Sequence, residues 1–265
     1  MILEIRDGCF TYPGAQSPTL TNVSLRLTES SIIAILGKNG IGKTTLTKCM
    51  GGILKWDSGQ TLIDGNEVAS AHGIKTIAFV PQAHRLPFPY TVRDLVIMGR
   101  VRHMGLLSIP SKRDRLIAED TLSELGIAHL SSRSCTQLSG GQLQLVFIAR
   151  ALAGEPAVLV MDEPESHLDM KNQYFILQLI ERLVREKGLS CIINTHYPDH
   201  ALRLSNQTLL LGENRSLFGD TAKMVTEENI KSFFGVRTKI AHLIDREHSY
   251  KTFIVLGLEN EEEII

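Results

Sequence analysis

Glycines and a lysine stand together in GKNGIGKTT, residues 37–45, directly after the apolar run SIIAIL, residues 31–36. The spacing fits G-x-x-x-x-G-K-[ST], in which glycines let successive backbone N–H groups point at phosphates. We expect Lys43 to reach the outer phosphates and the Thr44 hydroxyl to bind Mg²⁺. The alternative, a glycine-rich turn with an incidental lysine, is disfavoured because a strand precedes the pattern and a helix follows it. The expected phosphate-binding residues are Gly37, Lys38, Asn39, Gly40, Ile41, Gly42, Lys43, Thr44 and Thr45.

Two carboxylates end the apolar run in VLVMDEP, residues 158–164. Ligands of doubly wound sheets bind at the carboxyl ends of the strands, so this pair lies where a nucleotide would bind. Asp162 is expected to hold Mg²⁺, directly or through water, and Glu163 to polarise the attacking water. A solvated pair at a strand end is the alternative, and it would be preferred if the glycine-rich loop were absent.

Three further polar or aromatic residues follow expected strands. His196 comes after CIINT and would hydrogen-bond the γ-phosphate and the catalytic carboxylate. Gln82 comes after IKTIAFVP and would contact Mg²⁺ or the attacking water. Tyr12 is expected to stack on a purine ring, with a Tyr-Pro turn that packs on the sheet as the alternative.

Strands and helices must alternate to place these residues. Strands are expected at 3–10, 20–27, 31–36, 74–80, 157–162, 189–195 and 207–212, and helices at 44–50, 91–100, 113–125, 139–154, 170–187 and 226–234. Nearly continuous apolar strands separated by helices predict a parallel sheet covered on both faces. The mostly helical stretch from about 83 to 154 interrupts that alternation and is interpreted as an inserted helical subdomain. Within it, Ser111 and Asp114 form a capping-box pattern, and Gly126 is a plausible helix end.

The pentapeptide LSGGQ, residues 138–142, offers a second place for phosphate at a helix start, with Ser139 as N-cap but without a lysine. In this order with the motifs above, the chain resembles the nucleotide-binding subunits of ABC transporters over roughly residues 1–235. The resemblance implies an α/β fold: a P-loop NTPase (RecA-like) parallel-sheet core, an N-terminal antiparallel β-subdomain and the inserted α-helical subdomain. It also implies an ATPase.

The resemblance explains the second phosphate place. It implies a head-to-tail homodimer that encloses two ATP molecules, in which Ser139, Gly140 and Gly141 contact the γ-phosphate of ATP held on Lys43 of a second copy. Gln142 belongs to the same set, and Asp169 to a loop that crosses the interface. That loop departs from the usual pattern, with Glu165 in place of Thr and His167 in place of a common Ala. Neither change falls on an expected phosphate contact.

Three stretches resemble importers of siderophores, haem, cobalamin and some metal oxyanions. They are PYTVRDLVIMGR at 89–100, EPESHLDMKNQ at 163–173 and FGDTAKMVTEENIKSFFG at 218–235. In that branch the subunit lies under a separate membrane permease, on the cytoplasmic face of the cell membrane, and an external substrate-binding protein delivers the cargo. A groove for a permease helix would be lined by Phe88, Tyr90, Val92, Leu106 and Leu107. The alternative, that these residues pack inside the helical subdomain, is equally favoured.

Composition limits the other function classes. The 265 residues carry a formal net charge of −1 and contain no long apolar run, so neither nucleic-acid binding nor a membrane span is expected. Four widely spaced cysteines indicate reduced, packed thiols in a cytoplasmic protein. Residues 236–265 are expected to form a short extension with a β-hairpin. The competing hypothesis is a soluble ABC ATPase that remodels a cytoplasmic partner, such as an iron–sulfur assembly scaffold.

Overall fold

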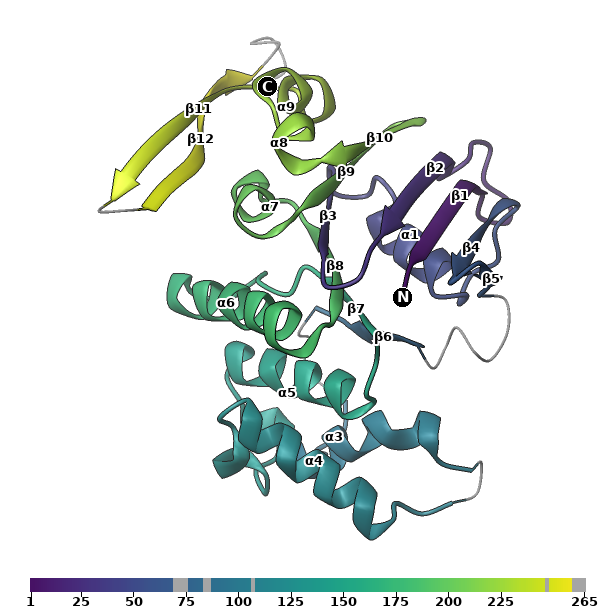
Figure 1. Ribbon diagram of the computed structural model, residues 1–265, viewed down its shortest axis with the longest axis vertical. Coiled ribbons are helices and arrows are strands. Elements are labelled where there is room, and N and C mark those ends of the chain that lie inside the picture. The colour runs from purple at the N-terminus through teal and green to yellow at the C-terminus, as the bar shows by residue number, and fades with distance from the viewer. Residues whose placement is uncertain (69–75, 83–86, 106–107, 246–247, 259–265) are drawn as a thin grey trace. The chain divides into compact units, whose positions relative to one another are not determined.

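The computed structural model describes residues 1–68, 76–82, 87–105, 108–245 and 248–258 (Figure 1). The chain divides into two compact units. Unit 1 contains residues 1–70 and 190–265, and unit 2 contains residues 71–189.

Unit 1 begins with an antiparallel sheet in the order β2-β1-β4-β5. Its strands are β1 (Leu3–Phe10), β2 (Leu20–Leu27), β4 (Ser58–Ile63) and β5 (Asn66–Glu67). Alternating apolar side chains bury one face of β1 and β2, as expected for a half-buried sheet. The sequence did not predict β4, whose Gly59 at φ +82° would place a Cβ only 2.4 Å from the Asp7 carbonyl oxygen. That glycine is therefore required for the pairing of β4 with β1.

The second sheet of unit 1 has the parallel core that the apolar runs predicted. Strand β3 (Ile32–Leu36) lies between β8 (Ser190–Thr195) and β9 (Gln207–Gly212), parallel to both. Every residue of β3 and β8 is buried, which explains why neither strand alternates. Strand β10 (Arg215–Asp220), which the sequence did not predict, pairs antiparallel with β9.

Helices surround this sheet within unit 1. They are α1 (Lys43–Met50), α7 (Pro198–Leu204), α8 (Thr221–Met224) and α9 (Glu227–Phe234). Ile230 and Phe233 of α9 pack with Leu36 and Leu210 in one apolar cluster. Helices α7 and α8 were missed by the sequence analysis, because seven and four residues are too few for a helical period to stand out.

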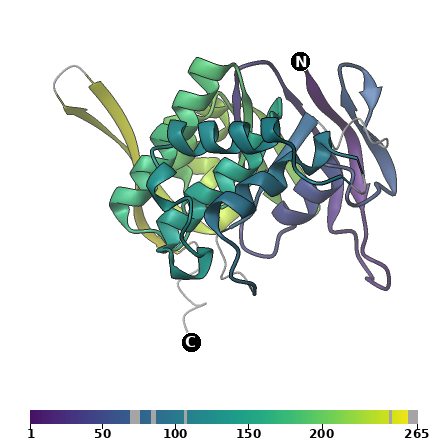
Figure 2. The ribbon, with the colours of Figure 1, turned by 90° about the horizontal axis from the view of Figure 1, so that it is seen from below.

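The C-terminal extension forms the expected hairpin from β11 (Val236–Asp245) and β12 (His248–Leu258). Its base is tied to two helices: Asp199 accepts a hydrogen bond from the Phe253 N–H at 2.8 Å, and Glu227 accepts one from the Ile240 N–H at 3.0 Å. Figures 1 and 2 show the hairpin and the antiparallel sheet at opposite sides of unit 1.

Unit 2 contains the parallel pair β6 (Ile77–Val80) and β7 (Val158–Asp162) and a second set of helices. These are α3 (Val92–Ile97), α4 (Lys112–Glu124), α5 (Gly140–Ala153) and α6 (Met170–Lys187), with short 3₁₀ helices at Met98–His103, Ala128–Leu130 and Cys135–Gln137. Helices α3 and α4 pack against α5. The α/β fold class with its helical insert is thus confirmed, whereas the exact domain boundaries stay a prediction.

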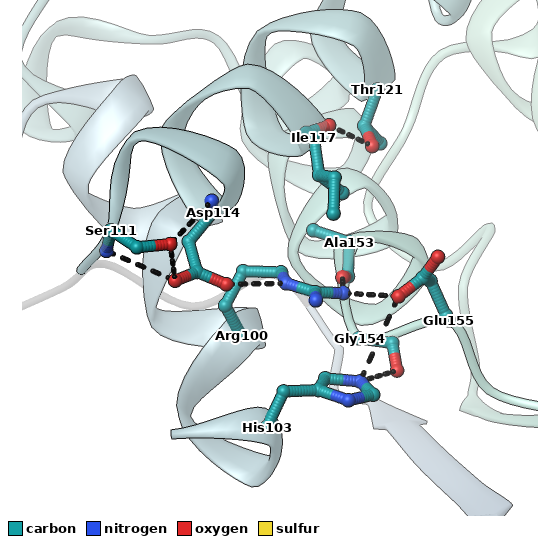
Figure 3. A network of polar contacts seen from close by, with 9 residues as sticks. All are labelled: Arg100, His103, Ser111, Asp114, Ile117, Thr121, Ala153, Gly154 and Glu155. Atoms are coloured by element: carbon teal, nitrogen blue, oxygen red, sulfur yellow. Dashed lines mark hydrogen bonds and ion pairs between the residues drawn. The ribbon is translucent and has the colours of Figure 1, made fainter. Parts of the chain in front are cut away.

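A network around Arg100 joins the 3₁₀ helix after α3, the start of α4 and the end of α5 (Figure 3). The buried guanidinium donates to Asp114 at 3.1 Å, to the Ala153 carbonyl at 2.8 Å and to Glu155 at 2.5 Å. Asp114 also completes the expected capping box with Ser111. Hydrogen bonds from the Ser111 hydroxyl and N–H, and then from Arg100, lower the pKa of Asp114 to about 2. The buried cation is therefore compensated by two carboxylates.

Gly99, beside this network, lies in closest contact with α5. A Cβ at this position would stand 1.9 Å from the Arg150 carbonyl oxygen and 2.9 Å from the Arg150 carbonyl carbon. Because both atoms belong to a helix backbone, only glycine lets the segment and α5 approach so closely.

All four cysteines are free thiols. Cys49, Cys135 and Cys191 are buried as expected, but Cys9 is half-buried and corrects that part of the expectation. Burial raises the pKa of the Cys49 and Cys191 thiols to about 12, so neither is a reactive thiolate.

Candidate functional site

The glycine-rich loop connects the end of β3 to the start of α1. A Cβ on Gly37 would lie 2.6 Å from the Leu211 carbonyl oxygen, and Gly42 adopts φ +110°, a conformation that other residues rarely take. Gly42 caps α1 without a side-chain hydrogen bond, and the first turn of the helix carries no acidic residue. Neither the N-cap residue nor an acidic side chain of the first turn caps this helix start, and a helix start of this kind suits an anion.

Lys43 folds back over its own loop. Its Nζ donates to the Gly37 carbonyl at 2.7 Å and to the Lys38 carbonyl at 3.1 Å, and the side chain is buried. The ammonium therefore lies at the loop, where it would meet a phosphate. That it reaches the outer phosphates stays a prediction.

Tyr12 reaches the same loop from the segment after β1. Its hydroxyl lies 3.1 Å from Thr45 Oγ1, and its ring packs edge-to-face on Phe10 with centroids 4.9 Å apart. The contact with Phe10 matches the alternative of a turn that packs on the sheet. With 41 % of the residue exposed, the ring is also open to solvent beside α1. Stacking on a purine stays a prediction.

His196 belongs to the edge of the sheet at which the loop begins. In the parallel pairing Leu36 is aligned with Thr195, so Gly37 and His196 each follow the last residue of neighbouring strands. The imidazole packs on the Tyr197 ring with ring centroids 4.0 Å apart, and the Tyr197 ring packs on that of His200 with centroids 4.7 Å apart. Unit 1 therefore gathers the loop, Tyr12 and His196 near one strand edge.

Unit 2 repeats this arrangement for the carboxylates. Val80 is aligned with Met161 in the parallel pair β6–β7, so Gln82 and the Asp162–Glu163 pair follow the same edge. Glu163 is half-buried, adopts φ +46°, and its Oε2 accepts a hydrogen bond from the Ser166 hydroxyl at 3.0 Å. The expected convergence of Gln82 with the two carboxylates at one edge is found.

The loop after these carboxylates, residues 163–169, makes contacts that the sequence did not predict. Gln82 Nε2 lies 3.0 Å from His167 Nδ1. His167 is exposed, and its backbone adopts φ +61°. Glu165 of the same loop is completely buried. The one sequence signal for the His167 contact and the Glu165 burial was that both residues depart from the usual loop pattern.

The LSGGQ helix begins as predicted. Ser139 caps α5 in a capping box: its hydroxyl accepts from the Gln142 N–H at 3.3 Å, and Gln142 Oε1 accepts from the Ser139 N–H at 3.1 Å. Gly140 is exposed. Gly141 is buried against Asn172, whose Cγ would be only 2.9 Å from a Cβ there.

Asn172 links this helix start to the loop 163–169. Its backbone N–H donates to Asp169 Oδ1 at 2.8 Å, and its side-chain amide donates to Oδ2 at 3.0 Å. Asp169 is thereby the N-cap of α6, and Gly141 and Asp169 contact the same asparagine. The sequence analysis missed Asn172, which no motif marks.

Of the residues expected to line a permease groove, some are exposed and some are buried. Phe88 is 59 % exposed and packs edge-to-face on Tyr90, with centroids 6.0 Å apart. Val92 is fully buried, so for that residue the groove prediction is wrong and packing within the helical subdomain is correct. Leu106 and Leu107 lie outside the described residues.

The chain is similar to known proteins over most of its length. The family model described as ABC transporter matches residues 20–166. The molybdate import ATP-binding protein MolC of Haemophilus influenzae is 35% identical over 84% of this chain and 84% of its own. A manganese transport ATP-binding protein, MntA of Synechocystis, is 35% identical over 85% of this chain and 86% of its own.

Among solved structures, an inward-facing metal-chelate type ABC transporter described as putative superposes with a TM-score of 0.88 at 33% identity, covering 96% of this chain and 97% of that one. The family match, the relatives and the superposition place the chain among ATP-binding cassettes. The chain belongs to the ABC transporter family and is an ATPase. Across the described ranges, no helix has the length and apolar character that a membrane crossing needs.

Proposed function

We propose that this chain is the ATP-hydrolysing subunit of an importer that takes up a metal chelate or a metal oxyanion through a separate permease. The observation that carries the proposal is the likeness, over almost the whole chain, to a metal-chelate type ABC transporter. The relatives are named for molybdate and manganese, which supports metal cargo as a class. Iron–siderophore, haem and cobalamin are the chelates that the importer-like stretches favour.

The nucleotide would be held mainly by unit 1. Gly37 to Thr45 supply backbone N–H groups and the Lys43 ammonium for the phosphates, and Tyr12 would stack on the base. Ser139 to Gln142 would contact the γ-phosphate bound to a second copy in a head-to-tail homodimer, across an interface that includes Asp169. Since ATP would bridge two subunits, its binding energy stabilises the closed dimer.

We also propose that Mg²⁺ binds with the nucleotide, because three of the expected residues carry donor atoms that suit it. Thr44 offers a hydroxyl, Asp162 a carboxylate and Gln82 an amide carbonyl, and oxygen donors of this kind are what Mg²⁺ prefers. Thr44 is exposed in the first turn of α1, and Asp162 and Gln82 are half-buried at the edge of β6–β7. When bound, the ion would neutralise charge on the phosphates.

Hydrolysis would rely on Glu163 as the base that polarises water and on His196 as a hydrogen-bonding partner of the γ-phosphate. The Ser166 hydroxyl, bonded to Glu163 Oε2, holds that carboxylate in one rotamer. Loss of the γ-phosphate would remove the bridge between the subunits and let the dimer open. This opening is the step that we propose drives transport.

The partners that follow are two permease subunits and, through them, an external substrate-binding protein, with this chain at the cytoplasmic face of the cell membrane. Phe88, exposed after the Gln82 loop, is our candidate permease contact.

The test is a pull-down of the tagged full chain from detergent-solubilised native membranes, followed by mass spectrometry. Recovery of a polytopic permease, reduced by Phe88→Asp, would support the proposal. Recovery of a soluble partner alone would contradict it and favour a soluble ATPase that remodels a cytoplasmic partner. With the permease in hand, ATP-dependent uptake of an iron chelate, molybdate and Mn²⁺ into proteoliposomes would identify the cargo.

A further inference from the structure

His167 holds the side chain of Gln82, a residue 85 positions earlier in the chain. The 3.0 Å contact joins Gln82 Nε2 to His167 Nδ1. We assign the amide with its nitrogen toward His167, so that Nδ1 is the acceptor and the ring proton is on Nε2. In this assignment the contact fixes both the histidine tautomer and the orientation of the glutamine amide.

That orientation determines which atom of Gln82 is left for a ligand. With the NH₂ group engaged by His167, the carbonyl Oε1 is the remaining polar atom of the amide. A carbonyl oxygen can bind Mg²⁺ or accept a hydrogen bond from water, whereas the NH₂ group can do neither. A freely rotating glutamine would present the wrong end for part of the time.

The backbone of the loop 163–169 is strained at His167, which supports a functional role for that residue. His167 and Glu163 both adopt positive φ, at +61° and +46°. Non-glycine residues in this region cost free energy, and such strain concentrates at functional sites. Neighbouring residues of the loop restrain two candidate hydrolytic groups, because Ser166 donates to Glu163 and His167 accepts from Gln82.

We propose that His167 is a positioning residue for ATP hydrolysis, which acts by presenting the Gln82 carbonyl oxygen to the metal or the attacking water. The inference rests on the proposed function of Gln82. It assigns a role to a position at which an alanine, common in related loops, would provide no acceptor.

Two substitutions separate the hydrogen bond from the backbone strain. Asparagine tolerates positive φ, and its Oδ1 is attached to Cγ as Nδ1 is in histidine, so His167→Asn keeps an acceptor in nearly the same place. Glycine also accepts positive φ but has no side chain. Any difference between His167→Asn and His167→Gly therefore reports the acceptor and not the backbone.

The experiment measures kcat and KM for ATP in the full chain with Mg²⁺, for both variants, for Gln82→Ala and for the double variant Gln82→Ala/His167→Gly. We expect His167→Gly to lower kcat about five- to fiftyfold with KM changed less than about twofold, since the lost contact misplaces a group used in the transition state. His167→Asn should recover most of the rate. The double variant should be no slower than Gln82→Ala.

Three results would overturn the inference: a normal kcat for His167→Gly, an asparagine variant as slow as the glycine variant, or two single effects that multiply in the double variant. If Gln82→Ala is itself slow, such a result removes the role of His167 alone. If Gln82→Ala retains the full rate, the proposed function of Gln82 fails as well.

Discussion

Gly99→Ala tests whether the helical subdomain depends on the close approach of the segment after α3 to helix α5. A Cβ at this position would lie 1.9 Å from the Arg150 carbonyl oxygen, about 1.5 Å short of the 3.4 Å at which ordinary contact begins. The obstructing atoms are helix backbone, so no side-chain rotation relieves the clash. The segment and α5 must separate, or the helix must bend.

The magnitude follows from two opposing effects. Overpacking of a well-packed interior costs about 1–3 kcal/mol, and a clash with backbone belongs at the upper end. Alanine in place of glycine in a helical segment raises the unfolding free energy by up to about 1 kcal/mol, because alanine has the higher helix propensity. The net loss of unfolding free energy is about 2 kcal/mol, which for a chain of this size lowers Tm by about 4–8 °C.

Thermal unfolding followed by circular dichroism, together with urea unfolding, measures the loss. Gly105→Ala is the matched control, since the nearest atom to its Cβ would be the Ser108 Oγ at 2.9 Å, the end of a side chain that can rotate. We expect that control to change stability by less than about 0.5 kcal/mol. Equal melting temperatures for the two variants would refute the packing argument.

Three further predictions concern hydrolysis and acid stability. Glu163→Gln should lower turnover about a hundredfold or more while ATP still binds, because the base is lost but an oxygen remains to accept from Ser166. If this variant stays monomeric with ATP and Mg²⁺ in size-exclusion chromatography, that result would count against the sandwich dimer. Ser139→Arg should abolish ATPase activity but leave nucleotide binding by the monomer intact, as measured by titration with a fluorescent ATP analogue; weakened binding would place the LSGGQ helix in the chain's own site. The pKa of Asp114 is about 2, below its ordinary 3.8, so the stability that its ionised form contributes is present above about pH 4 and is lost as the pH falls to about 2. The difference in Tm between wild type and Asp114→Asn should therefore shrink over that range, and a constant difference would exclude this linkage.

The phosphate loop and the parallel core were predictable because local rules determine them. Buried parallel strands need continuous apolar residues, and the loop between β3 and α1 needs glycine where the backbone adopts positive φ or approaches Leu211. The caps at Ser111 and Ser139 were predictable for the same reason, since a hydroxyl at a helix start bonds a neighbour three residues away.

The elements that were missed are short or polar. Strand β5 has two residues and β10 alternates weakly, so neither presents a clear period, and both are formed by pairing with a neighbouring strand. The contact between Gln82 and His167 was beyond the sequence, because it joins distant residues through the parallel alignment of β6 and β7. The burial of Glu165 was not predicted, because the burial of a carboxylate depends on packing that no local pattern encodes.

The hairpin of β11 and β12 has open strand edges on either side of the N–H groups that donate to Glu227 and Asp199, because in the described part of the chain its two strands pair only with each other. Unpaired edges are templates on which a strand from another molecule can add. Leu243, Ile244 and Val255 are exposed on this ribbon and make such addition more favourable. Lys239 and Lys251 are exposed on it as well, and their charges repel a second ribbon. Salt screens that repulsion but not the apolar attraction, so purified protein should aggregate more readily at high ionic strength than at low.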